Sequence, residues 1–173
     1  MERAGAFTAV PGVGMIAIGL TALLASAIGA GTENGQGWLT TWIGEAVVAA
    51  LISAVTITAK ARRLGLPLRS GPARKFALAF LPSLGAGAAL TYTLSGHGLG
   101  SLLPGVWLLL YGTAVTAAGS LSVRIVPLMG VAFMATGVAA LVASPQYGNA
   151  LMAVGFGGLH IVFGAVVWRY FGG

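Results

Sequence analysis

Six long apolar runs, separated by short polar breaks, dominate the sequence. They cover approximately residues 12–30, 38–59, 76–94, 101–119, 125–143 and 150–168. An α-helix rises about 1.5 Å per residue, so a run of about 20 residues crosses the roughly 30 Å hydrocarbon core of a bilayer. The runs are continuous rather than alternating, which disfavours a β-barrel. The pattern predicts an all-α integral membrane protein, with residues 1–173 forming a single domain of six transmembrane helices.

Charge content supports the same class. Only 7% of the residues are charged and 57% are hydrophobic, whereas a soluble domain carries about 25% charged residues. The absence of Cys from the sequence excludes disulfides and thiolate metal ligands. Ala25-Ser26-Ala27 resembles a cleavage site, so a signal peptide is the alternative interpretation of the first run.

The stretch Lys60–Lys75, KARRLGLPLRSGPARK, carries six of the nine Lys and Arg residues. With six spans, the other three basic residues fall on the same side as this stretch, and the opposite breaks carry none. The positive-inside rule then predicts a basic cytoplasmic loop at 60–75, both termini in the cytoplasm and a bacterial-type inner (plasma) membrane. Residues expected to contact anionic lipid headgroups are Lys60, Arg62, Arg63, Arg69, Arg74 and Lys75.

This topology also accounts for the sequence pI near 10.6, so the basic residues do not indicate a nucleic-acid partner. Aromatic residues near the predicted span ends are typical of a membrane-interface belt. They are Trp38, Trp42, Tyr147, Trp168 and Tyr170.

An internal repeat is suggested by two octets. Gly19–Ser26 reads GLTALLAS and Gly137–Ser144 reads GVAALVAS, with five of eight positions identical. Leu84–Ser95 is a weaker third copy. The pattern predicts three helical hairpins over 1–60, 76–120 and 125–170, and chance similarity between Gly/Ala/Leu-rich spans is the alternative.

Glycine is abundant, with 28 residues. Helices in lipid associate through close backbone contact at small residues. Gly157 and Gly164 share one face of the sixth run with His160, and we expect both glycines to serve helix packing.

Glu45 is the only acidic residue within the apolar runs, His160 is the only histidine within them, and Tyr111 lies in the middle of the fourth run. They take roughly equivalent places on the second, fourth and sixth spans, so they form a candidate buried polar cluster. Three interpretations remain open. The cluster is a structural hydrogen-bond network, a site for protons or a small solute, or the seat of a haem or chlorophyll-type ligand on His160.

Catalytic and metal signatures are not evident. Two His and one Glu in separate segments lack the spacing of a metal site, and Gly155–Gly158 (GFGG) follows no strand, so it does not resemble a phosphate loop. Ser and His occur without a triad arrangement. We therefore predict no catalytic residues, no metal and no resident cofactor.

A resemblance is carried by Met129–Arg169, MGVAFMATGVAALVASPQYGNALMAVGFGGLHIVFGAVVWR, with a fainter echo in Gly12–Arg62. A glycine-spaced apolar helix, an Ala-Ser-Pro turn and a second helix with a basic end resemble the small six-span acid-resistance membrane proteins, the HdeD-like family. The resemblance implies six inner-membrane helices and a role in acid stress. It supplies no catalytic residues.

The sequence therefore favours a non-enzymatic inner-membrane bundle of stress or accessory type, whose polar cluster senses pH or binds a small ligand. A proton-coupled or small-solute channel or transporter is the alternative. A haem- or pigment-binding subunit of a larger complex is a further alternative. Expected partners are membrane lipid and either a second copy or a larger membrane complex.

Overall fold

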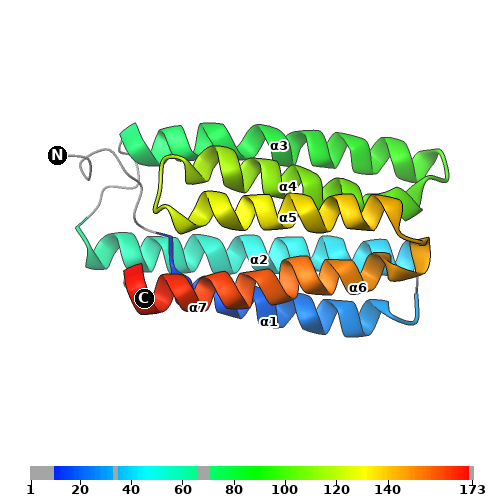
Figure 1. The fold of residues 1–173 in the computed structure, drawn as a ribbon, viewed down its shortest axis with the longest axis horizontal. Coiled ribbons are helices and arrows are strands. Elements are labelled where there is room, and N and C mark those ends of the chain that lie inside the picture. The colour runs from blue at the N-terminus through cyan, green and yellow to red at the C-terminus, as the bar shows by residue number, and fades with distance from the viewer. Residues whose placement is uncertain (1–9, 33–34, 66–70, 172–173) are drawn as a thin grey trace.

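The computed structural model describes residues 10–32, 35–65 and 71–171, and every regular element among them is helical. Six helices are long and apolar enough to cross a membrane, which confirms the predicted all-helical class and the six apolar helices. Insertion in a membrane stays a prediction. Five of them are single α-helices, and the sixth is built from three consecutive segments (Figure 1). The bounds are α1 (Gly12–Gly29), α2 (Gln36–Arg63), α3 (Gly71–Gly96), α4 (Leu103–Gly119), α5 (Ile125–Val142), and then α6 (Gly148–Met152), the π-helical segment η4 (Ala153–Leu159) and α7 (His160–Phe171).

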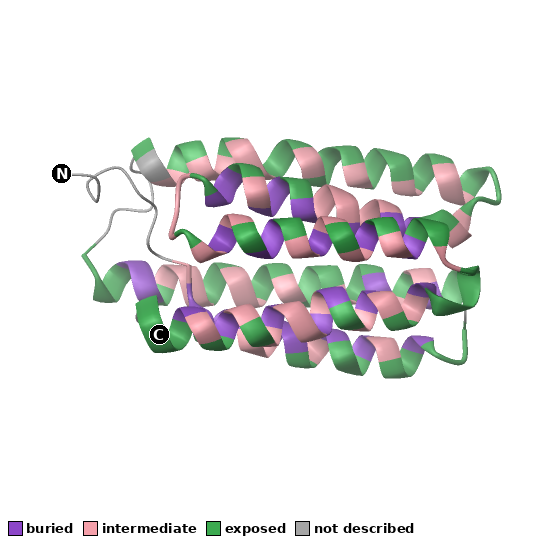
Figure 2. Ribbon diagram, viewed as in Figure 1, coloured by how far each residue is buried: buried purple, intermediate pink, exposed green. Residues whose placement is uncertain are grey.

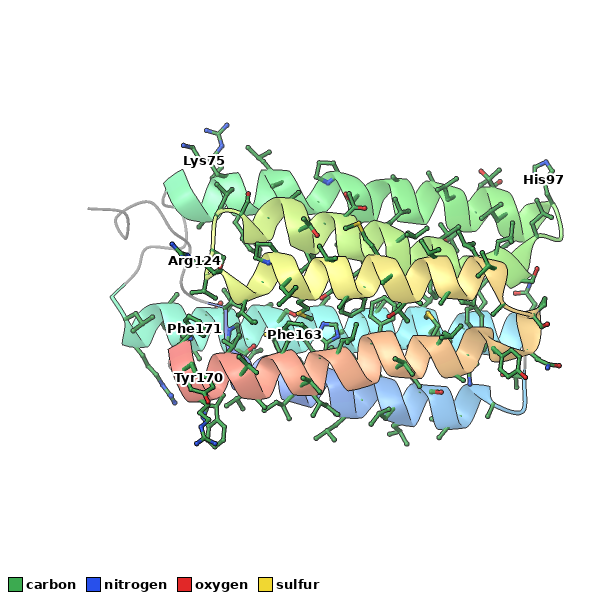
Figure 3. The ribbon with its side chains drawn as sticks, viewed as in Figure 1. Lys75, His97, Arg124, Phe163, Tyr170 and Phe171 are labelled. Carbon is green, nitrogen blue, oxygen red and sulfur yellow. The ribbon has the colours of Figure 1, made fainter. Side chains whose placement is uncertain are left out.

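Successive helices run antiparallel along one common axis (Figure 1). Short 3₁₀ turns, η2 (Gly100–Leu102) and η3 (Pro145–Tyr147), precede the fourth and sixth helices. Lys75, Arg124 and Tyr170 lie at one end of the bundle, and His97 lies at the other (Figure 3). The described basic residues at the ends of α2, α3 and α7 therefore lie at the end of the bundle where α1 begins and α7 ends. We call this end the basic end.

The loop expected at 60–75 differs in the structure. Helix α2 continues through Arg63 and α3 starts at Gly71, so most of the basic residues lie on helix ends. Cations in the last turn of α2 interact favourably with the helix dipole. Pro72 is the second residue of α3, where a missing N–H costs nothing, so it is compatible with the helix.

Two helix pairs are held together by glycine. Where α4 meets α5, an ideal Cβ added to Gly112 would lie 2.7 Å from the Gly130 carbonyl oxygen, and one added to Gly130 would lie 2.6 Å from that of Gly112. Where α1 meets the sixth helix, a Cβ on Gly19 would lie 2.6 Å from the carbonyl oxygen of Gly157. We call these two contacts the glycine seams. Each seam brings backbone against backbone, as helix association in lipid favours.

Gly164 belongs to the second seam, because a Cβ there would lie 2.9 Å from the Gly12 carbonyl oxygen. The expected packing glycines Gly157 and Gly164 thus both face α1. By contrast, Gly44 on α2 and Gly85 on α3 have open space where a Cβ would be.

Burial is uneven around the bundle. Buried positions are concentrated on α1, α4, α5 and the sixth helix, whereas α2 and α3 are mostly exposed or intermediate (Figure 2). Helix α2 packs mainly on α1, and α3 packs mainly on α4. The threefold hairpin repeat stays a prediction.

Candidate functional site

His160 and Tyr111 meet in the middle of the bundle. The Tyr111 hydroxyl lies 2.8 Å from Nε2 of His160, and Nδ1 of His160 lies 2.9 Å from the Phe156 carbonyl oxygen. His160 is 2% exposed. Because a carbonyl oxygen only accepts, Nδ1 carries the proton that is donated to Phe156. In the neutral imidazole, Nε2 is then the acceptor and the Tyr111 hydroxyl donates to it.

The π-helical segment η4 places the imidazole. It spans Ala153–Leu159, contains three of the helix's glycines and ends directly before His160. A π-helix hydrogen-bonds one residue further along than an α-helix, so it rotates the residues that follow, and such turns are frequent at functional sites. Gly157 and Gly164 face α1, while His160 reaches Tyr111 on α4. Sequence reasoning missed this segment, and the glycine-rich GFGG string was its only visible signal.

Aromatic rings from three elements surround the pair. The ring of Tyr111 lies 5.8 Å from Phe80 of α3, 4.8 Å from Phe133 of α5 and 5.1 Å from Phe156 of η4, measured between centroids. Phe133 also lies edge-on to His160 at 5.3 Å, and Phe156 is stacked on it at 6.2 Å. We call Phe80, Phe133 and Phe156 the aromatic shell. It leaves the imidazole surrounded by hydrocarbon.

Glu45 belongs to a different contact. Its Oε1 lies 2.9 Å from the Thr21 hydroxyl of α1, and Glu45 is partly exposed. Among the described residues, the hydrogen-bond partner of Glu45 is Thr21. The three residues predicted as one cluster therefore form two separate pairs, Tyr111 with His160 and Glu45 with Thr21.

Asn149 is a half-buried polar centre that sequence reasoning missed. Its Oδ1 accepts from the indole N–H groups of both Trp38 and Trp42, each at 3.0 Å. Its Nδ2 donates to the carbonyl oxygen of Ser26 at 2.9 Å and lies 3.2 Å from the Ser26 hydroxyl. These contacts tie α1, α2 and α6 together.

The two tryptophans correct part of the predicted aromatic belt. Trp38 is 1% exposed and Trp42 is 3% exposed, and Trp38 stacks on Trp107 of α4 at 5.5 Å. They serve the core because their N–H groups find an acceptor there. Tyr147, Trp168 and Tyr170 are exposed near the helix ends.

The basic end separates into two kinds of residue. Arg62, Arg63, Arg74 and Lys75 are exposed, and Arg69 lies outside the described residues. Lys60, also expected to contact headgroups, is only 7% exposed, and its ammonium donates to the Val10 carbonyl oxygen at 3.0 Å. A second, longer contact joins it to the carbonyl oxygen of Phe171. Lys60 therefore connects the end of α2 with the start of α1 and the end of α7.

A haem or chlorophyll-type ligand on His160 stays a hypothesis. In the arrangement described, both ring nitrogens are hydrogen-bonded, and Phe133 and Phe156 lie beside the ring. Axial ligation would have to break the bond to Tyr111 and displace Phe133 or Phe156. Among the residues that the structure describes, no group of three His, Cys, Asp or Glu side chains is placed to hold a metal ion.

Comparison with protein-family models finds no match, and the same holds for comparisons with curated proteins and with solved structures.

Proposed function

We propose that the chain is a non-enzymatic inner-membrane protein of stress or accessory type that responds to acid through the His160–Tyr111 pair. The observation that supports the proposal is an imidazole that is 2% exposed and whose two nitrogens each make one hydrogen bond. The resemblance to six-span acid-resistance membrane proteins favours the same role. The charge asymmetry supports an orientation with the basic end and both termini in the cytoplasm.

A second proton on His160 has to go to Nε2. That nitrogen then becomes a donor, so the Tyr111 oxygen has to accept and its own proton must turn away. The surroundings are the rings of Phe133 and Phe156. Their faces stabilise a cation in part, but a desolvated charge still costs several kcal/mol relative to water.

Acidification therefore favours any arrangement of the bundle in which the imidazole is hydrated. His160 and Tyr111 join the sixth helix to α4, so loosening this contact weakens the packing of these two helices against each other. For a single proton, the stability of the closed bundle falls by at most about 1.4 kcal/mol per pH unit.

The test compares His160→Gln with the wild-type protein in lipid nanodiscs, between about pH 8 and pH 5. We expect the wild-type unfolding midpoint to fall on acidification and the variant's midpoint to stay nearly level. His97→Gln is the matched control, because His97 is the other histidine of the chain and is exposed at the far end. Equal pH dependence in wild type and His160→Gln would contradict the proposal.

A further inference from the structure

Glu45 stands apart from the aromatic shell. It lies on α2, on the stretch of the helix where Ile43, Val47 and Val48 are exposed. Glu45 itself is partly exposed, and its Oε1 contacts Thr21 on α1. It is the only acidic residue in the six long helices.

The Thr21 hydroxyl has more acceptors than protons. Its oxygen lies 2.9 Å from the Ile18 carbonyl oxygen and 2.9 Å from Oε1 of Glu45. A hydroxyl donates one proton and accepts through its lone pairs. If Glu45 were ionised, Thr21 would satisfy only one of these two oxygens. If Glu45 carries a proton, it donates to Thr21 and Thr21 donates to Ile18, so both contacts are hydrogen bonds.

Compensating charge is distant among the described residues. Helix α1, which packs against α2 here, has the sequence GVGMIAIGLTALLASAIG and carries no ionisable side chain. The nearest cation along α2 is Lys60, about 22 Å further along the helix, and its ammonium is bonded to the Val10 carbonyl at the basic end. An ionised carboxylate at this depth in a bilayer would be unpaired, which costs at least about 2.5 kcal/mol.

We propose that Glu45 and Thr21 form a proton-binding site that opens toward the bilayer between α1 and α2, with Glu45 held as a neutral carboxylic acid. The site is independent of the His160–Tyr111 pair, which lies among α3, α4, α5 and η4. Its proton sits on a partly exposed side chain rather than in the closed core. It follows that membrane-soluble reagents reach Glu45 and water-soluble reagents do not.

The test uses N,N′-dicyclohexylcarbodiimide, a lipophilic reagent that adds to protonated carboxyl groups. Purified protein in phosphatidylcholine nanodiscs is treated at about pH 8, and adducts are located by peptide mass spectrometry. An ordinary glutamate, with a pKa of about 4.3, is protonated at less than roughly one part in a thousand at that pH. Glu2 and Glu33, the other two acidic side chains of the sequence, are the internal controls.

We expect the adduct to form mainly on Glu45, with labelling at least about tenfold higher there than on Glu2 or Glu33. A water-soluble carbodiimide at the same pH should leave Glu45 unlabelled. The absence of a Glu45 adduct, or equal labelling of Glu45 by the two reagents, would overturn the proposal. These comparisons need no substitution, so they do not depend on a variant folding.

Variants then test the role of Thr21. Glu45→Gln should abolish the adduct. Thr21→Ser keeps the hydroxyl and should label like the wild type, whereas Thr21→Val removes the acceptor and should label several-fold more slowly. Equal labelling in Thr21→Val would remove Thr21 from the site. The readout is a covalent bond to Glu45, so it is separate from the pH response assigned to His160.

Discussion

Replacing Gly112 with Ala tests whether the glycine seam between α4 and α5 determines the stability of the bundle. The added methyl group would lie 2.7 Å from the Gly130 carbonyl oxygen and 2.8 Å from the Met134 backbone nitrogen. Ordinary van der Waals contact for a Cβ begins near 3.4 Å. The two helices therefore have to move apart by about 0.7 Å, because both obstructing atoms belong to the backbone and cannot rotate away.

The energetic cost follows from this displacement. Overpacking of a close contact typically costs about 1–3 kcal/mol. The movement also weakens the contacts of Phe133 and Leu108, both fully buried near this seam, because dispersion energy falls steeply with small gaps. We expect Gly112→Ala to reduce the free energy of unfolding by about 1–3 kcal/mol.

Gly85→Ala is the matched control, because nothing lies within 4 Å of a Cβ at Gly85. It removes a helical glycine without crowding and should be neutral or stabilising by up to about 1 kcal/mol. The assay is unfolding by sodium dodecyl sulfate in mixed micelles, followed by tryptophan fluorescence and by far-UV circular dichroism. Equal unfolding free energies for the two variants would refute the role assigned to backbone contact at Gly112.

Two further substitutions probe the polar contacts, the first in the same unfolding assay and the second by limited proteolysis. Asn149→Leu leaves the indole N–H groups of Trp38 and Trp42 without their acceptor. We expect the free energy of unfolding to fall by about 1–3 kcal/mol and the tryptophan emission to shift. Unchanged stability and emission would show that the amide is dispensable. Lys60→Met keeps the length of the side chain but removes its donation to Val10, so we expect faster proteolysis near the ends of α1 and α7, and wild-type cleavage rates would argue against that connection.

The six apolar helices were predictable because length and hydropathy alone determine them. A run such as 125–143 has no charged residue that would favour another structure, and α5 occupies Ile125–Val142. The end of α2 and the start of α3 were less predictable, because a stretch rich in Lys and Arg is compatible with either a loop or a helix end. Tertiary packing at the basic end decides between them, and Lys60 buried against Val10 is part of that packing.

The polar contacts depend on helix rotation, which composition does not reveal. Tyr111 and His160 were identified as unusual for their depth, and the structure brings them together. Glu45 was identified for the same reason, yet it turns toward Thr21, a residue that ordinary helix patterning does not distinguish. Asn149 falls in the break between the predicted runs 125–143 and 150–168. The local sequence there indicates a turn, and it does not reveal which helices pack beside this residue.

The pairing of α1 with the sixth helix has a consequence for biosynthesis. Gly12 and Gly19 face Gly164 and Gly157, so α1 meets this partner only after the sixth helix has been made. Helix α5, by contrast, meets α4 as soon as it emerges. During translation this face of α1 therefore has another neighbour, and its contact with the sixth helix forms late. Interrupting synthesis before Gly157 would leave α4 and α5 packed together and α1 without its contact to the sixth helix.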